Sequence, residues 1–512
     1  MRSDFVRLVR DWRVWASVTA AIMLVLPLAV ARHLNVVDGP GHEARLAVLS
    51  DILIGGRASP YYSITTFLLP NIAYDVIGLR LAWLGGAEVA ARVFLGATLI
   101  LTLAGVVVLN RAATGRWSAA PLAAALLVHN LMVVEGFLNY LFGLALVPWA
   151  LALRLKLGGA RGIAAGALAA VVLLLCHLFD FGLYAVMAFG LAVAAWRARE
   201  ISPSGFALRL LEFVPALVLL ALMPRDSSMN IQFEHDFVMG KLAGILRAFS
   251  CGSLTGDIAF LAGTAIFVIS LLFARVGFSR PLAPGLMLLA VLYFLLPRDL
   301  GHAALVDKRL PIAFALFLIA GLDVRYRSRT VAAGLAVLTA LAFVVKQGAI
   351  AILWHRMDGE IGAAVVALDT MPPGTEVFSA ECHPPDDLLS VYSDHQPALA
   401  LVPALAALDQ TRFFGGIWAI PSQQPIAVRP QYRAAYDLQT DIDWSVCGEK
   451  PLRKVASRIG ALADGRPHYL FVVRPEMPRS LDEKVVASGA AYELYRIASS
   501  GTVRGRVGNL HP

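Results

Sequence analysis

The sequence predicts an α-helical polytopic membrane protein of about eleven transmembrane helices, followed by a small C-terminal α/β domain outside the cytoplasm. Composition is the first observation: 58% of the 512 residues are hydrophobic and 16% are charged. Soluble proteins run nearer about one half and one quarter, and a soluble domain could not cover so much apolar surface. The second is a series of apolar stretches within residues 1–352, and the third is the return of charge, proline and glycine after them.

The apolar stretches are each roughly 15–22 residues long, close to the length that crosses a hydrocarbon core of about 30 Å. Proline and glycine blur their ends, so the count carries a margin of about two. The first stretch lacks a small-x-small cleavage site before Arg32 and His33, which predicts a retained helix rather than a signal peptide. The stretches are 14–31, 89–109, 119–134, 138–155, 162–178, 181–196, 206–223, 257–274, 283–297, 309–323 and 330–351.

Lysine and arginine gather in alternate short loops between these stretches, which is the positive-inside pattern of cytoplasmic loops. The pattern accounts for the net charge of +8, so we do not expect nucleic-acid binding. We expect a multi-pass protein of the bacterial inner (plasma) membrane, with its N-terminus cytoplasmic and, after an odd number of spans, its C-terminal domain periplasmic. The basic loops hold Arg2, Arg7, Arg10, Arg13, Arg111, Arg116, Arg154, Lys156, Arg161, Arg197, Arg199, Arg275, Arg280, Arg325, Arg327 and Arg329.

Residues 64–84 are apolar enough to resemble a further span, but they contain Pro70, Asp75 and Arg80. Such residues are costly at the middle of a bilayer, and counting this span would invert every later loop. We therefore expect an interfacial or re-entrant helix here. An amphipathic helix is expected over 42–54, lying on the membrane with a single apolar stripe and its polar edge toward a cavity. Together the two segments make a long first external loop, residues 32–88, within the transmembrane domain 1–352.

The second predicted domain, residues 353–512, has a normal domain size and contains no stretch long enough to span. Strand-like pieces occur at 376–380, 468–474 and 492–498, with a helical stretch at 452–462. Cys382 and Cys447 both fall in this domain, and a periplasmic location allows them either to form a disulfide or to stay free.

Acids and histidines collect in the loops predicted to be external, whereas the cytoplasmic loops hold mostly arginine. The Gly39-Pro40-Gly41 turn places Asp38 just beyond the first helix. Two simpler readings stay open: external loops are free to be acidic, and a lone histidine at a helix end, such as His177, is more often a capping or packing residue. The candidate residues are Asp38, His42, Glu43, Arg45, His177, Asp180, Glu234, Asp236, Lys308 and Arg309.

The phrases "VDGPGHEARL", "GFLNYLFGLAL", "CHLFDFGLY" and "VDKRLPIAF", within this architecture, resemble the GT-C class of integral membrane glycosyltransferases. The resemblance implies that an acid in the first external loop acts as base, that the donor is a polyprenyl-phosphate sugar, and that transfer occurs on the external face. That role falls on Asp38. Many members show two adjacent acids there, whereas here the second acid is Glu43.

Sugar transfer from a lipid phosphate needs a base for the acceptor hydroxyl and positive charge or a metal for the departing phosphate. Asp38 or Glu43 fits the catalytic base. Glu234 and Asp236 offer oxygen ligands for a divalent cation, Mg²⁺ or Mn²⁺. The residues expected to bind substrate or phosphate are His42, Arg45, His177, Asp180, Lys308 and Arg309.

The sequence therefore predicts an inverting membrane glycosyltransferase that moves a sugar from a polyprenyl-phosphate donor to an envelope acceptor on the periplasmic face. One alternative is a transporter or flippase of an envelope polysaccharide or lipid, although we find few mid-span charges and no internal repeat. The other is a non-catalytic membrane component of such a system. No GxSxG, HExxH, Walker or GxGxxG motif supports another chemistry.

Overall fold

The computed structural model divides the chain into two compact units, and each is described by itself. The predicted boundary at residues 352 and 353 lies next to the division, but most of the predicted loop 32–88 belongs to unit 2. Unit 1 comprises Met1–Val30, Leu68–Tyr74 and Val93–Leu353; unit 2 comprises Ala31–Phe67, Asp75–Arg92 and Trp354–Pro512. The structure describes residues 12–224, 231–234, 236–301, 303–381, 397–442, 449–462, 465–473, 481 and 483–498, so Cys382 and Cys447 lie outside the described residues.

Among the described residues, eight helices are long and apolar enough to cross a membrane, and three shorter apolar helices accompany them. Each coincides with one of the predicted stretches, and the polytopic helical membrane class is confirmed. The long ones are α2 Trp12–Val30, α5 Gly86–Thr114, α8 Leu138–Lys156, α9 Gly159–Cys176, α10 Leu178–Arg197, α11 with α12 over Pro203–Leu222, α14 Leu254–Leu272 and α17 Arg329–Asp369. The shorter ones are Ala120–Glu135, Arg280–Leu295 (which contains α15 Ala283–Leu295) and α16 Arg309–Gly321.

The stretch Ala120–Glu135 is broken into η2 Ala120–Ala124, α6 Ala125–Val128 and α7 Leu131–Glu135. Its break is stabilised by Lys346 of α17, whose Nζ donates to the carbonyl oxygens of Leu126 and His129, each at 2.7 Å. Asn130 begins the next helix by accepting from the amide of Met132 at 2.9 Å. Carbonyls freed by a helix break need partners where lipid replaces water, and a lysine from another helix supplies them.

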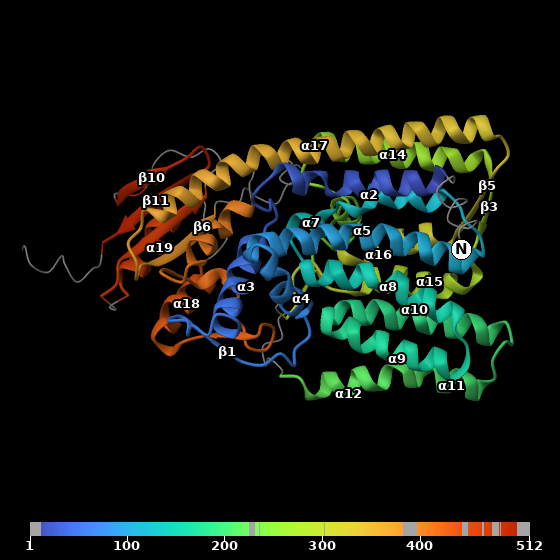
Figure 1. Cartoon of the computed structure of the whole chain (residues 1–512), viewed down its shortest axis with the longest axis horizontal. Helices are drawn as coiled ribbons and strands as arrows, with labels where there is room; N and C mark the ends of the chain where they lie inside the picture. Colours follow the sequence, from blue (N-terminus) through green and yellow to red (C-terminus); the bar gives the residue numbers. More distant parts are fainter. Residues whose placement is uncertain are drawn as a thin grey trace, which may run out of the picture. The chain divides into compact units, whose positions relative to one another are not determined.

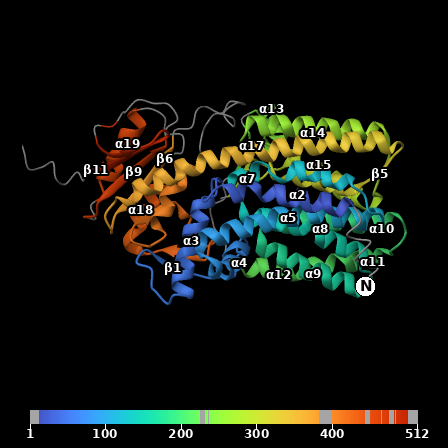
Figure 2. The same ribbon diagram turned by 45° about the horizontal axis from the view of Figure 1, so that its top comes forward.

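The two ends of unit 1 differ in their chemistry. At one end, β3 Ala274–Phe278 pairs antiparallel with β5 Leu322–Tyr326, and the Asn110 amide donates to two carbonyls of the chain entering β5. Figure 1 shows β3 and β5 together at one end of the bundle, and Figure 2 shows β5 at the same end in a second view. The short basic loops lie at this end because successive helices alternate in direction, and the candidate acids and histidines of unit 1 lie at the opposite end.

That opposite end of unit 1 carries α13 Phe237–Ala248 and a short antiparallel pair, β2 Ile231–Gln232 with β4 Asp299–Leu300. α13 has two different faces. Lys241, Gly244 and Ala248 are buried at helical spacing, whereas Val238, Leu242 and other large apolar residues are exposed on the other side. The helix therefore lies against the bundle along one stripe only.

Unit 2 is built on a five-stranded mixed sheet in the order β10-β11-β9-β6-β7. β6 runs parallel to both β7 and β9, whereas β9, β11 and β10 are antiparallel neighbours. The structure confirms the three predicted strands and the predicted helix. The elements are β6 Glu376–Glu381, β7 Phe413–Phe414, β8 Ile426–Val428, β9 His468–Val473, β10 Lys484–Ser488, β11 Tyr492–Ile497, η5 Pro397–Ala407, η6 Gly415–Ile417, η7 Pro430–Tyr432, α18 Arg433–Thr440 and α19 Glu449–Gly460.

The first loop is part of this unit. It contains α3 Gly39–Leu53, β1 Tyr62–Ile64, α4 Ala73–Leu81 and η1 Ala82–Leu84. β1 pairs antiparallel with β8, and the Tyr62 hydroxyl donates to the carbonyl of Phe414 at 2.8 Å. α4 has nine residues, about 14 Å of helix, which is too short to span a bilayer.

The prediction for residues 42–54 was wrong in one respect. We expected a helix lying on the membrane with a single apolar stripe, but α3 is buried on its polar side as well: His42, Glu43 and Arg45 are 6%, 4% and 0% exposed. α3 packs against η5 and η6, and its Val48 and Leu49 join the core of unit 2. Segments that are distant in sequence, η5 and η6, thus cover the side of α3 that was expected to face a cavity.

Candidate functional site

The first group of candidate residues stands at the start of α3. Asp38 is the N-cap residue, and its carbonyl accepts from the amide of His42 at 3.0 Å. Its half-buried carboxylate makes no capping hydrogen bond, so the side chain is not used to begin the helix. Pro40 stands in the first turn, where its missing N–H costs nothing. The helix therefore begins without a capping hydrogen bond from the Asp38 carboxylate.

Arg45 links the start of α3 to α4 through a fully buried ion pair. Its Nε donates to Asp75 Oδ1 at 2.8 Å, and its Nη2 lies 2.8 Å from His42 Nδ1. Burial raises the pKa of Asp75, and the guanidinium of Arg45 opposes that rise. Because Asp75 matches its charge, Arg45 in this arrangement orients His42 rather than presenting a cation to a phosphate.

Glu43 differs from its neighbours because no cation accompanies it. No hydrogen bond or ion pair joins it to any residue that the structure describes, although it is only 4% exposed. Burial raises the pKa of Glu43 to about 8; Glu88 raises it further, and Arg92 opposes the rise. Glu43 therefore holds a proton at neutral pH and releases it under mildly alkaline conditions.

The second group lies in unit 1 around His177, the N-cap residue of α10. Its Nδ1 accepts from the amide of Phe179 at 3.0 Å, and its Nε2 lies 3.2 Å from Arg309 Nη1. A neutral imidazole with Nδ1 as acceptor carries its proton on Nε2. Two N–H donors then face each other, which creates a position for an acceptor oxygen. The guanidinium of Arg309 also lies 4.8 Å and 5.0 Å from the rings of Phe137 and Tyr140.

Asp180 lies one turn into α10 and is fully buried. Neither of its carboxylate oxygens has a hydrogen-bond partner among the described residues. The close approach of α8 depends on Gly143, where a Cβ atom would come within 1.9 Å of Asp180 Oδ2. Buried acceptors without donors are costly, so the Asp180 carboxyl is suited to hydroxyl groups supplied by a ligand.

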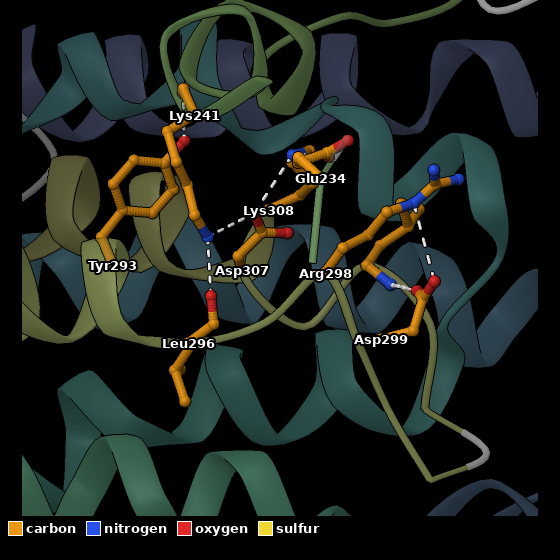
Figure 3. Close-up of polar contacts among 9 residues, drawn as sticks. Glu234, Lys241, Tyr293, Leu296, Arg298, Asp299, Asp307 and Lys308 are labelled. Atoms are coloured by element: carbon orange, nitrogen blue, oxygen red, sulfur yellow. Dashed lines mark hydrogen bonds and ion pairs between the residues drawn. The ribbon is translucent and has the colours of Figure 1, made fainter. Parts of the chain in front are cut away.

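The third group is a network of alternating charges in unit 1, drawn in Figure 3. Lys308 Nζ donates to Glu234 Oε1 at 2.7 Å and to Asp307 Oδ2 at 3.1 Å. Lys241 of α13 donates to the same Asp307 oxygen and to the carbonyl of Leu296, both at 2.7 Å. Asp307, 0% exposed, therefore bridges the two lysines.

Glu234 and Asp236, which were predicted to hold a divalent cation, make other contacts in the structure. The Glu234 carboxylate contacts Lys308, and the Asp236 carboxylate caps α13 by accepting from the amide of Met239 at 3.0 Å. Among the described residues, no group of three or more His, Cys, Asp or Glu side chains could hold a metal ion. In this arrangement Glu234 and Asp236 do not fit a cation, and the expected Mg²⁺ or Mn²⁺ stays a prediction.

The candidates thus form two sets, with Asp38, His42, Glu43 and Arg45 in unit 2 and the others in unit 1. Within unit 1 the second and third groups meet at Lys308 and Arg309, consecutive residues at the start of α16. The expected convergence of the two sets in one cavity stays a prediction.

Sequence reasoning did not select as site residues three charged residues that complete these groups, Asp75, Lys241 and Asp307, or Lys346 at the helix break. Lys346 could have been found, because it is a single cation inside the apolar stretch 330–351, and charged residues within membrane spans are often functional. Asp75 and Lys241 pair with residues that are distant in sequence, so no local pattern indicates those contacts.

A bundle of apolar helices, a long first loop that forms interior helices, and an α/β unit completed by the C-terminal segment together have the architecture of the GT-C fold. One solved structure supports this fold. The chain is similar to ArnT from Cupriavidus metallidurans bound to undecaprenyl phosphate, with a TM-score of 0.50 and 15% identity over 96% of this chain and 98% of that chain.

Two further solved structures are similar at lower scores. The apo state of the same ArnT has a TM-score of 0.47 at 13% identity, covering 96% of this chain and 99% of that chain. Arabinofuranosyltransferase AftD from Mycobacteria has a TM-score of 0.45 at 14% identity, covering 96% of this chain and 40% of that chain. No model of a protein family and no curated protein matches the chain.

Proposed function

We propose that the protein is a glycosyltransferase of the bacterial inner membrane that moves a sugar from a polyprenyl-phosphate donor to an envelope acceptor on the periplasmic face. The fold is compatible with this activity, and the ArnT structure to which the chain is similar holds undecaprenyl phosphate. The excess of cations in the loops at the β3–β5 end favours a cytoplasmic location for that end. The candidate residues of unit 1 then face the periplasm.

The observation that carries the proposal is the approach of His177 Nε2 to Arg309 Nη1, 3.2 Å apart, while His177 Nδ1 accepts from the amide of Phe179. Two N–H groups 3.2 Å apart repel each other unless an acceptor oxygen lies beside them. A phosphate oxygen of the donor fits this position, because charge-assisted hydrogen bonds from arginine to phosphate are strong and directional. The carboxyl of Asp180, which has no hydrogen-bond partner among the residues that the structure describes, is suited to hydroxyl groups of the sugar.

In the proposed reaction the acceptor hydroxyl oxygen attacks the anomeric carbon of the sugar, opposite the phosphate. The bond between that carbon and the phosphate oxygen breaks, and its electron pair stays on the phosphate, which leaves as polyprenyl phosphate. The hydroxyl proton passes to a carboxylate, and the configuration at the anomeric carbon inverts. Arg309 and Lys308 stabilise the charge that develops on the phosphate.

We assign the base to Asp38, with Glu43 as the alternative. The raised pKa of Glu43, about 8, leaves this carboxyl protonated at neutral pH, so it donates a hydrogen bond there rather than accepting a proton. An Asp38 base predicts activity that is already high at pH 7. A Glu43 base predicts a rate that climbs as the pH passes through about 8.

The test is transfer by purified protein supplied with a panel of polyprenyl-phosphate sugars, read as released polyprenyl phosphate by mass spectrometry. Asp38→Asn should reduce release by at least about a hundredfold, the range in which general bases contribute. Asp51→Asn is the matched control, because Asp51 lies at the other end of α3 and pairs with Arg57. Unchanged release by Asp38→Asn would remove Asp38 as the base, and no release from any donor would reject the proposal in favour of a transporter or a non-catalytic component.

The expected cation and the expected orientation have their own measurements. Loss of transfer in EDTA, restored by Mg²⁺ or Mn²⁺, would support a divalent cation; full activity in EDTA would rule out a labile one.

The orientation is tested by a reporter fusion. Alkaline phosphatase fused after the C-terminal unit should be active, since that reporter works only outside the cytoplasm. An inactive fusion with a fluorescent cytoplasmic counterpart would overturn the orientation.

A further inference from the structure

The charge network around Lys308 is balanced within itself. Lys241 and Lys308 contribute two positive charges, and Glu234 and Asp307 contribute two negative ones. Removing the Glu234 carboxylate would leave one net positive charge. A polyprenyl phosphate carries at least one negative charge, both as the monoester and as the diester that it forms with a sugar, so it could replace Glu234 as the counter-charge of Lys308.

The network has a fixed part and an exchangeable part. Lys241 and Asp307 are 2% and 0% exposed, and Lys241 is also held by the carbonyl of Leu296 at the C-terminus of α15. The Glu234 side chain is 19% exposed, and Lys308 is its only partner among the described residues. Of the two carboxylates on Lys308, Glu234 is therefore the one that can leave.

The surroundings of Glu234 fit an anionic lipid better than a soluble anion. α13 packs directly on Lys308: a Cβ atom at Gly244 would come within 2.6 Å of Lys308 Nζ. The other face of the same helix exposes Val238 at 62% and Leu242 at 52% of their surface. Figure 3 shows Lys241 extending from its helix toward Asp307, and Lys308 toward Glu234. One helix thus offers an ionic face and an apolar face to a molecule with an ionic head and an apolar tail.

We propose that Glu234 occupies, on Lys308, the position that the phosphate of a polyprenyl-phosphate lipid takes in the liganded protein. The carboxylate stands in for the phosphate while the site is empty, and it moves away when the lipid binds. The isoprenoid tail lies along the exposed apolar face of α13. This inference rests on the proposed function for the identity of the lipid, but its test measures binding alone and needs neither sugar nor acceptor.

The experiment measures binding of undecaprenyl phosphate to the purified full chain in detergent micelles. Glu234→Gln keeps the shape of the side chain and removes the competing charge. It should tighten binding on the order of tenfold, the effect of losing a partly buried competing ion pair. Lys308→Gln should weaken binding by at least as much. Equal or weaker binding by Glu234→Gln would overturn the proposal.

Two other probes separate the lipid from its head group. Undecaprenol has the same tail without phosphate, and its binding should be unchanged in Glu234→Gln. Inorganic phosphate has the head group without the tail, and its binding should stay weak in both proteins. If inorganic phosphate gained affinity as much as the lipid did, the ligand would be a free phosphate and the role of α13 would be rejected.

The matched control is Asp323→Asn. Asp323 is a carboxylate of similar exposure, 23%, and it also pairs with a cation, Arg325, but it lies on β5 at the other end of unit 1. Removing the Asp323 carboxylate should leave the affinity for undecaprenyl phosphate unchanged. If Asp323→Asn raised that affinity as much as Glu234→Gln does, the effect would come from net charge, and the assignment of Glu234 would be overturned. Melting temperatures of all variants check that each is folded. If the wild-type protein transfers sugar but Glu234→Gln binds undecaprenyl phosphate no more tightly, this inference is overturned and the proposed function stands. If Glu234→Gln binds the lipid more tightly but the protein transfers no sugar, the inference stands and the proposed function fails.

Discussion

Glu43 in unit 2 and Glu234 in unit 1 are the same residue type in opposite electrostatic settings. Glu43 is buried with no cation in contact, and burial raises its pKa to about 8. Glu234 lies against Lys308 at 2.7 Å and keeps part of its side chain exposed. A buried carboxyl without a counter-charge holds a proton, whereas one beside a lysine holds a charge that a ligand can replace. The chemistry available at each site follows from this difference.

The largest effect should come from removing the shared counter-charge in unit 1. Asp307→Asn leaves Lys241 and Lys308 buried with Glu234 as their only carboxylate, so stability should fall by about 3–5 kcal/mol. Thermal unfolding in detergent measures the loss. Adding Lys241→Met to this variant should recover part of it. A change within error for Asp307→Asn alone would mean that the network does not hold unit 1 together.

A comparable removal in unit 2 should cost slightly less. Asp75→Asn leaves one buried cation, Arg45, without its carboxylate partner, instead of two. We therefore expect the free energy of unfolding to fall by about 3 kcal/mol. His42 should also lose its fixed position, because Arg45 contacts both side chains. The histidine ring signals in NMR spectra of the variant should broaden. An equal or larger loss than in Asp307→Asn would contradict the view that the unit 1 network concentrates more charge.

Glu43→Gln should produce a change of opposite sign that depends on pH. The pKa of Glu43 is raised from 4.5 to about 8, so the folded state keeps a proton that the unfolded state releases between these values. The stabilising contribution of this proton is fully present below about pH 4.5 and is lost as the pH rises to 8, by on the order of 5 kcal/mol at most. The variant lacks this dependence, so the melting temperature of Glu43→Gln relative to that of the wild type should rise from pH 5 to pH 9. A constant difference over this range would exclude a buried proton on Glu43.

The smallest effect should come from the ion pair at the other end of unit 1. Arg325 is 54% exposed, and solvent screens its attraction to Asp323. Asp323→Asn should therefore leave the melting temperature unchanged at any salt concentration. A clear loss would show that exposure is a poor guide to the strength of these charge pairs.

Features set by local pattern could be predicted from the sequence, and features set by distant partners could not. The strand at 492–498 and the span at 138–155 carry their own periodicity and length, and both form as expected. The polar side of α3 was expected to face a cavity because local spacing cannot reveal that η5 and η6 cover it. Likewise, Asp180 was noticed from its place after a helix end, but the shortage of donors around it depends on packing against Gly143.

The partners of the charged residues were the hardest to predict. Lys241 and Asp307 are 66 residues apart, and only the fold brings them within 2.7 Å. Lys308 was predicted as a phosphate ligand, but nothing in its neighbourhood indicated that Glu234 would occupy it first. Charge type and predicted face were sufficient to select the candidates, because both depend on composition. Pairing depends on three-dimensional proximity.

The contact of Lys346 with the broken helix has a consequence for biogenesis. α17 follows the broken stretch by about 200 residues, and a lysine within an apolar span opposes insertion by about 3 kcal/mol when it meets lipid alone. The carbonyls of Leu126 and His129, which relieve that cost, belong to a stretch that is synthesised earlier. Stable insertion of α17 is therefore expected to depend on the broken stretch being in place.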